Sequence, residues 1–205
     1  MDKEIRAFNF ELRAEDDEQR GKIITGRPIV YGSRTNMVDF DEVIDEGALD
    51  ATDLKDVRLL VNHNTDMLPL ARSRNNTENS TMQLTVDAEG MTIRANLDTE
   101  NNADAKSLYS AVSRGDVSGM SFMFTVDKDS WEDVNTNHPV RHVRSISRVF
   151  EVSAVTWPAY SATSIQARGL ADALESAKAS LESERRRLAE LEQKKTEIRE
   201  ILGVL

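Results

Sequence analysis

Most of the chain up to residue 158 alternates apolar and polar positions, a pattern that predicts short β-strands. Single strands are expected at residues 3–13, 22–32, 56–64, 117–126 and 143–158. Two more alternating runs, within residues 80–98, flank the turn sequence DAEG and predict a hairpin. The polar stretches between these runs are expected to be loops: the charged turn AEDDEQRG, a short loop at FDEVIDEGALD, and a polar insertion before the last strand.

Two segments have helical spacing instead. Residues 102–115 place four apolar side chains on one helical face before Gly115, which predicts a helix that stops there. From Leu170 onward the chain lacks proline and aromatic residues, and apolar residues recur at intervals of four and three. This apolar stripe comprises Leu170, Leu174, Ala177, Leu181, Leu188, Leu191, Ile198, Leu202 and Leu205. The pattern predicts a coiled-coil helix, whose stripe should pack on the strand domain, on a partner or on a second copy.

Many short strands with one or two helices predict an α+β fold. The expected architecture is a small, mainly antiparallel β-barrel, closed or nearly closed, with flanking helices. The abrupt change of composition divides the chain into a strand-rich domain at residues 1–168 and a helical tail at residues 169–205. A length of 205 residues suits one globular domain with such an appendage.

The bulk composition narrows the possible partners and cofactors. A net charge of −10 argues against a nucleic-acid partner, because phosphate contacts need clustered Lys and Arg. No apolar run is long enough to cross a bilayer, and the N-terminus lacks a signal-peptide core, so a cytoplasmic protein without a membrane partner is expected. The absence of cysteine excludes disulfides, thiolate metal sites and cysteine nucleophiles. Without a known metal or phosphate motif, neither a metal nor a cofactor is expected.

The most apolar predicted strand contains an unusual serine. In VSGMSFMF, residues 117–124, the even-numbered positions from 120 onward are apolar, whereas Ser121 lies on the other face beside Gly119. The alternation places Ser118 on the core face, so Ser121 is the candidate nucleophile. A serine hydroxyl reacts at neutral pH only when an adjacent base takes its proton. The alternative is a structural serine that donates to a carbonyl of a neighbouring strand.

His63 is the best candidate for that base among three histidines. His138 and His142 lie in polar surroundings and are expected at the surface. His63 continues the alternation of the apolar residues in its predicted strand, so it should project to their side. A hydrogen-bonded structural histidine is the alternative for this residue.

Glu151 places a carboxylate between two apolar faces of the last predicted strand. A buried carboxylate needs a partner. An imidazole that the carboxylate orients would be one such partner. An arginine, Arg144 or Arg148, is the alternative.

Several sequence segments together resemble a known family. The segments occur in the order ITGRPIVYGS, FDEVIDEGAL, VRLLVNHN, LARS, GMTIRANL, VSRGDVSGMSFMF and VFEVSAVTWPAYSAT. Over roughly residues 4–168 this ordered set resembles the prohead maturation proteases of tailed bacteriophages, a family related in fold to the herpesvirus assemblins. Met123 stands where relatives often have glycine, but it neighbours the candidate nucleophile and does not replace it.

The resemblance implies a serine endopeptidase that works inside an assembling procapsid in the host cytoplasm. Such proteases cleave the scaffold, or the scaffold-like N-terminal extension of the major capsid protein, and then themselves. Carried over by motif, Ser121 would be the nucleophile, His63 the general base and Glu151 the acid that orients it.

Three further expectations accompany this resemblance. Backbone N–H groups should stabilise the oxyanion, with help from an arginine among Arg141, Arg144 and Arg148. The tail should target the protease or hold it as a homo-oligomer, and self-cleavage is expected within about ten residues of Arg168. Two rival functions remain open: a non-catalytic scaffold or assembly protein, and another hydrolase such as an esterase.

Overall fold

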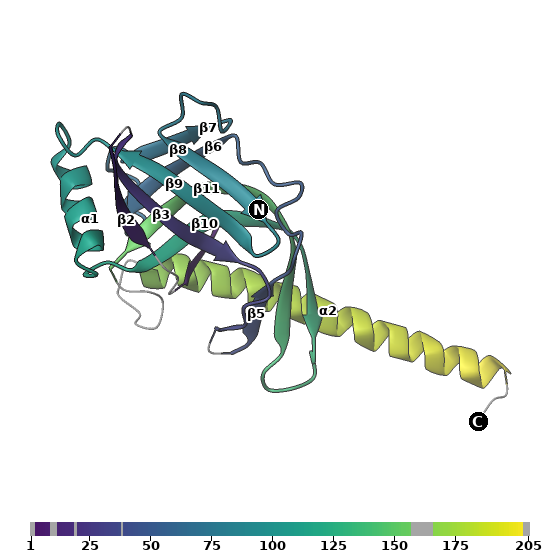
Figure 1. The fold of residues 1–205 in the computed structure, drawn as a ribbon. Helices are drawn as coiled ribbons and strands as arrows, with labels where there is room; N and C mark the ends of the chain where they lie inside the picture. The colour runs from purple at the N-terminus through teal and green to yellow at the C-terminus, as the bar shows by residue number, and fades with distance from the viewer. Residues whose placement is uncertain (1–2, 9–11, 19, 38, 157–165, 203–205) are drawn as a thin grey trace.

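The computed structural model describes the chain except for residues 1–2, 9–11, 19, 38, 157–165 and 203–205 (Figure 1). The end of the last predicted strand, part of the expected self-cleavage region and Leu205 of the apolar stripe lie outside the described residues. The described part forms two β-sheets and two helices, of which the second is long and extends away from the sheets. The predicted α+β class is confirmed.

The larger sheet is built around two long antiparallel strands, β10 and β11. Strand β1 pairs with the outer edge of β10, and β5 and then β4 follow beyond β11. Strand β6 also pairs with β11, in parallel, and β7 pairs with β6, which makes seven strands among the described residues. The bounds are β1 Lys3–Phe8, β4 Thr35–Asn36, β5 Asp41–Ile44, β6 Asp56–Val61, β7 Ala71–Arg74, β10 Gly119–Glu132 and β11 Val140–Val155.

The smaller sheet is antiparallel, with the strand order β2-β3-β9-β8. Its bounds are β2 Arg13–Asp17, β3 Gly21–Val30, β8 Met82–Asp87 and β9 Gly90–Leu97. One continuous core joins this sheet to one face of the larger sheet and to helix α1, through buried residues that include Ile24, Ile29, Ile93, Ala95, Leu108, Val112, Met120, Phe122, Phe124, Val152 and Ala154. Residues at the intervening positions of β10 and β11, such as Ser121 and Ser153, therefore belong to the opposite face of the larger sheet.

The predicted closed or nearly closed barrel is not observed, because the described strands are divided between two sheets and no closed ring of paired strands forms among them. The predicted first strand, residues 3–13, is also divided. Its start forms β1, whereas Arg13 begins β2 in the other sheet. The charged AEDD sequence, expected in a turn, lies in β2, which pairs with β3, and its three carboxylates form ion pairs with Lys22 and Arg94.

Two predicted loops contain strands. FDEVIDEGALD contains β5, and the polar insertion extends the β10–β11 hairpin as far as the pair Glu132 and Val140. The hairpin of β8 and β9 and helix α1, Ala103–Ser113, form where the pattern predicted them. Asn102 caps α1 by accepting hydrogen bonds from two backbone N–H groups of the first turn.

Helix α2, Gln166–Leu202, follows the predicted helical tail but packs partly on the strands. Ala177 and Leu181 are buried in a second apolar cluster that also contains Phe40 and Trp131. Farther along, Leu191 is 41% exposed and Ile198 is 55% exposed. The stripe is therefore covered by the strands only in part, and the division into domains at residues 168 and 169 stays a prediction. Within the described residues, neither helix combines the length and apolarity that a membrane crossing requires.

Candidate active site

A left-handed turn at the end of β6 positions His63. The strand stops at Val61, and the next two residues have positive φ angles, 51° at Asn62 and 57° at His63. Asparagine and histidine adopt this conformation more readily than most residues do. The predicted strand continued to residue 64 and would have placed His63 with the apolar residues of its strand. That prediction is wrong, because the turn directs the imidazole to the opposite face, where Glu151 lies.

His63 and Glu151 form a buried pair. The distance between Nδ1 of His63 and Oε1 of Glu151 is 2.6 Å, and the two side chains are 6% and 4% exposed. An ionised carboxylate only accepts hydrogen bonds, so Nδ1 carries the proton and donates it to Glu151. In the neutral imidazole, Nε2 is then left as an acceptor. The alternative that Arg144 or Arg148 pairs with Glu151 is wrong. The carboxylate bonds to His63 and Ser153, whereas the two arginines pair with Asp45 and Asp53.

Ser153 connects both members of this pair, and it was not singled out from the sequence. Its hydroxyl donates to Oε2 of Glu151 at 2.6 Å and accepts from the backbone N–H of His63 at 3.0 Å. The preceding residue of the turn is also held by β11, because the N–H of Asn62 donates to the carbonyl of Ala154. The side chain of Asn62 in turn accepts from the backbone N–H of Thr156 at 3.0 Å.

Ser121 is separated from the His63–Glu151 pair by one residue, Ser153. In the register of β10 and β11 it faces Ser153, and it is fully buried. Its hydroxyl donates to the backbone carbonyl of Arg6 in β1 at 2.7 Å. Nε2 of His63 is buried without a hydrogen-bond partner among the described residues, so the bond between Ser121 and His63 is not formed in this conformation. The hydrogen bond expected of a structural serine is thus present, beside an imidazole with an unused acceptor.

The prediction for Ser118 is wrong. This residue precedes β10 and is exposed, so the strand alternation that placed it on the core face does not extend to it.

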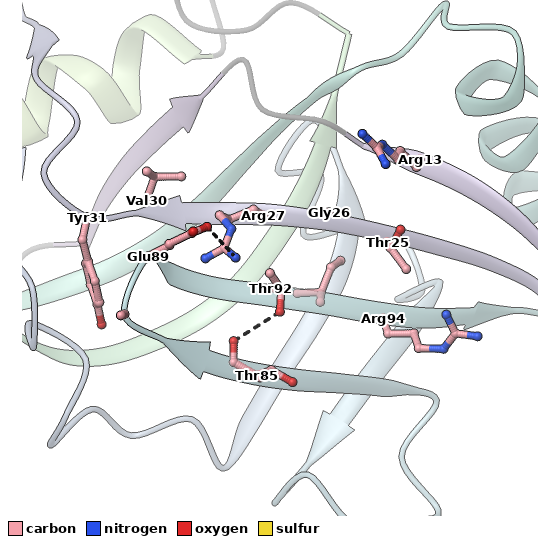
Figure 2. A pocket seen from close by; sticks show the side chains of 12 residues that line it. Arg13, Thr25, Gly26, Arg27, Val30, Tyr31, Thr85, Glu89, Thr92 and Arg94 are labelled. Atoms are coloured by element: carbon pink, nitrogen blue, oxygen red, sulfur yellow. Dashed lines mark hydrogen bonds and ion pairs between the residues drawn. The ribbon is translucent and has the colours of Figure 1, made fainter.

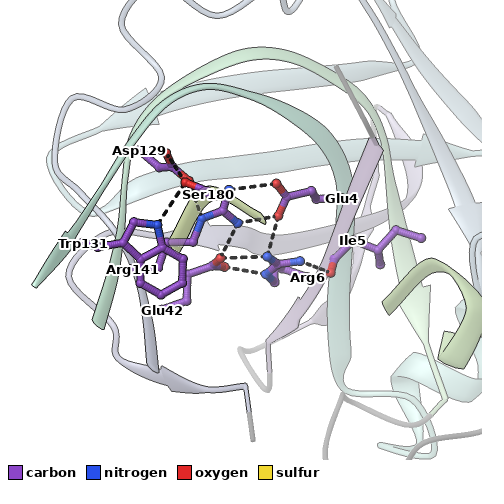
Figure 3. Close-up of polar contacts among 8 residues, drawn as sticks. All are labelled: Glu4, Ile5, Arg6, Glu42, Asp129, Trp131, Arg141 and Ser180. Carbon is purple, nitrogen blue, oxygen red and sulfur yellow. Dashed lines mark hydrogen bonds and ion pairs between the residues drawn. The ribbon is translucent and has the colours of Figure 1, made fainter. Parts of the chain in front are cut away.

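The three arginines considered for the oxyanion have other contacts. Arg141 is buried in an ionic cluster with Glu4, Glu42, Asp129 and Arg6, which Figure 3 shows. Arg144 bonds to Ser130 and pairs with Asp45. Arg148 lies over the ring of Phe150 at 4.9 Å and 3.8 Å from a carboxylate oxygen of Asp53. None of these contacts involves His63 or Ser121, so an arginine role at the oxyanion stays a prediction.

A groove on the smaller sheet is separate from this site. Figure 2 shows it over β3 and β9, where Arg27 and Arg94 are among its lining residues. Arg27 pairs with Asp87, and Arg94 pairs with Glu15. Because these cations are already paired and no candidate catalytic residue lines the groove, it offers no competing centre. In the part of the chain that the structure describes, no group of three His, Asp or Glu side chains is arranged to hold a metal ion.

The family match and one sequence relative agree with the sequence motifs. The chain is 29% identical over 149 residues to the prohead protease of Enterobacteria phage HK97, an alignment that covers 71% of this chain and 61% of that relative. A solved structure, that of the bacteriophage T4 capsid assembly protease, matches with a TM-score of 0.38 and 13% identity over 76% of this chain and 99% of the other. Residues 8–177 match the family described as Caudovirus prohead serine protease. The chain belongs to this family of prohead serine proteases.

Proposed function

We propose that this chain is a serine endopeptidase of phage procapsid maturation, with Ser121 as nucleophile, His63 as general base and Glu151 as orienting acid. One observation carries the proposal. The buried imidazole of His63 is bonded through Nδ1 to Glu151, and its Nε2 has no hydrogen-bond partner among the described residues. The buried Ser121 lies opposite Ser153, the residue that bonds to both His63 and Glu151. Side chains opposite each other in an antiparallel pair have Cβ atoms about 4.5–5.5 Å apart, so Ser121 lies close to the residue that holds His63.

Catalysis would begin when the Ser121 hydroxyl rotates away from the carbonyl of Arg6 and donates to Nε2 of His63. As Oγ attacks the carbonyl carbon of the scissile peptide, the serine proton passes to Nε2 and an oxyanion forms. His63 then returns that proton to the leaving amine as the C–N bond breaks. Water repeats the sequence on the acyl-enzyme and releases the second product. Glu151 stays ionised throughout and stabilises the imidazolium.

The proposed substrates are the scaffold, or the scaffold-like N-terminal extension of the major capsid protein, and the chain itself. The family description and the HK97 relative support a place in the prohead, so the proposed location is the procapsid interior. Self-cleavage is proposed within about ten residues of Arg168, where the chain enters the tail. A homo-oligomer joined through α2 is part of the proposal, because Leu191 and Ile198 leave apolar surface exposed on this helix.

A non-catalytic assembly protein is the second candidate. The hydrogen bond from Ser121 to Arg6 and the complete burial of Ser121 favour it, because a resting serine in this position is not accessible to a substrate. The two candidates differ in whether Ser121 reacts.

Co-expression with the capsid protein of the same phage distinguishes the candidates. Wild type, Ser121→Ala and the matched control Ser118→Ala would be compared by intact-mass analysis of both proteins. Cleavage by wild type and Ser118→Ala, with none by Ser121→Ala, is the expected result. Cleavage by all three proteins would show that the nucleophile is another residue. Assembled capsids with no cleavage by any variant would favour the assembly protein.

A further inference from the structure

We propose that Ser153 is a positioning residue of this site, one that holds the general base and its orienting acid in a single arrangement. The catalytic consequence rests on the proposed function. The arrangement itself rests on three hydrogen bonds among His63, Glu151 and Ser153. Ser153 does not reach a substrate in this proposal. It acts through His63 and Glu151.

The hydroxyl of Ser153 uses both of its hydrogen-bonding roles within the site. It has one proton, which it donates to Oε2 of Glu151 at 2.6 Å. Its oxygen accepts the backbone N–H of His63 at 3.0 Å. Ser153 is 0% exposed, so no solvent competes for either bond. A buried hydroxyl that bonds to an ionised carboxylate makes one of the stronger kinds of hydrogen bond.

These contacts hold His63 at two points. The imidazole donates through Nδ1 to one oxygen of Glu151, while the backbone N–H is held by the serine that bonds to the other oxygen. The carboxylate therefore cannot rotate without breaking a bond at each oxygen. His63 also has a left-handed backbone, with φ at 57°, a conformation that persists only when neighbouring contacts favour it. Ser153 supplies one of those contacts.

The position of Ser153 in the sheet joins this arrangement to the nucleophile. Ser121 faces Ser153 across the β10–β11 pair, and Leu60 of β6 faces it on the other side. Ser153 is thus paired both with β10, which carries the nucleophile, and with β6, which leads into the His63 turn. A shift of about 1 Å in a catalytic group can reduce the rate about 10²-fold, so loss of the Ser153 hydroxyl should reduce turnover more than substrate binding.

The kinetic test compares Ser153→Ala, Ser153→Thr and Ser147→Ala on the capsid protein. Ser147 lies in the same strand and is the matched control, because its half-buried hydroxyl donates to the carbonyl of Thr125 in the neighbouring strand β10. We expect Ser153→Ala to lower kcat about 10- to 100-fold with KM changed by less than about twofold. Ser153→Thr keeps the hydroxyl and should recover part of the loss, and Ser147→Ala should behave as wild type. An unchanged kcat in Ser153→Ala would overturn the proposal.

A spectroscopic test does not depend on cleavage. In the inactive Ser121→Ala background, proton NMR should detect the hydrogen-bonded Nδ1–H of His63, assigned by its loss in His63→Gln. The pair of His142 with Asp45, joined at 2.8 Å through the same ring nitrogen, provides an internal reference. Adding Ser153→Ala should shift or broaden the His63 signal and leave that of His142 in place. An unchanged His63 signal would overturn the proposal.

The two tests separate the possible failures. If wild type does not cleave the capsid protein but the His63 signal depends on Ser153, the proposed function fails and the positioning role stands. If Ser153→Ala does not fold, Ser153→Cys replaces it in both tests, because the thiol has a similar shape but is a weak donor and acceptor. The expected loss of kcat and the change of the His63 signal are the same for that variant, and normal values for both would overturn the proposal.

Discussion

Two buried polar clusters lie in the same seven-stranded sheet, and they differ in one respect. The ionic cluster of Glu4, Arg6, Glu42, Asp129 and Arg141 leaves none of its buried polar atoms without a partner among the described residues (Figure 3). The candidate active site, by contrast, leaves Nε2 of His63 buried and unpaired. A fully paired buried network stabilises one arrangement of strands, whereas an unpaired acceptor is available for chemistry.

The two clusters meet at Arg6. Its guanidinium bonds to Glu42 at 2.7 Å within the ionic cluster, and its backbone carbonyl accepts the hydroxyl of Ser121 at 2.7 Å. The ionic cluster thus anchors the strand that holds the nucleophile in its resting position. The cluster also reaches the tail, because Ser180 of α2 bonds to Asp129 and to the indole of Trp131. Mutations in the candidate active site should therefore change activity, and mutations in the ionic cluster should change stability.

The largest expected effect comes from Glu151→Gln. The amide can donate to Nδ1, which favours the tautomer with its proton on Nε2 and removes the acceptor that Ser121 needs. We expect kcat for cleavage of the capsid protein to fall about 10⁴-fold. The thermal midpoint should change little, which circular dichroism would measure. Equal cleavage rates for the two proteins would show that Glu151 is not part of the catalytic group.

Arg141→Met should have the opposite profile. Removing one partner of a buried ion pair typically lowers the free energy of unfolding by about 3–5 kcal/mol, since the other charges stay buried without it. Urea titration would measure this loss. Arg144→Met is the control, because this side chain is 50% exposed and its ion pair should contribute about 1 kcal/mol or less. Similar losses in both variants would contradict the distinction between a buried cluster and surface pairs.

Leu181→Ala tests whether the tail helix is part of the folded body. Leu181 is 9% exposed in the cluster with Phe40 and Trp131, so its truncation should lower the free energy of unfolding by about 2–3 kcal/mol. Leu191→Ala, at a side chain that is 41% exposed, should change it by less than about 0.5 kcal/mol in a monomer. A concentration-dependent loss for Leu191→Ala would instead support the proposed oligomer.

The smallest expected effect is a dependence of stability on acid. Burial alone would raise the pKa of Glu42, but the charges of Arg6 and Arg141 outweigh burial, and the pKa lies below its ordinary value of 4.5. As the pH falls, Glu42 is therefore protonated in the unfolded chain before it is protonated in the folded protein. The stability that its charge contributes is complete above pH 4.5 and is lost as the pH falls through the folded-state pKa. Urea titrations at a series of pH values from neutral to acid should show that the free energy of unfolding falls less steeply with pH for Glu42→Gln than for wild type. Identical slopes would exclude this contribution.

Local patterns predicted the local elements of this fold. The β8–β9 hairpin and helix α1 form at their predicted places because adjacent residues decide a turn and a helix cap. The division of residues 3–13 between two sheets was not predictable, because it depends on pairing with strands far along the chain. The same limit explains the missing barrel: alternation predicts strands but not which strands become neighbours.

For the candidate site, residue types were informative and geometry was not. Ser121, His63 and Glu151 were selected as polar residues at apolar positions or by motif, and the parallel pairing of β6 with β11 brings the last two together. The left-handed turn that orients His63 has only a weak signal, the asparagine before it. Ser153 could have been noticed as a hydroxyl two residues after Glu151 on the same face, but its contact with the backbone of His63 depends on that parallel pairing.

Covalent labelling of the protease while it acts on the capsid protein would show directly whether Ser121 is the nucleophile. A fluorophosphonate probe would be added to the co-expressed proteins, and the modified residue would be mapped by peptide mass. One adduct is expected, on Ser121, and it should be absent in His63→Ala. Cleavage of the capsid protein with the adduct on another serine, or with no adduct, would contradict it.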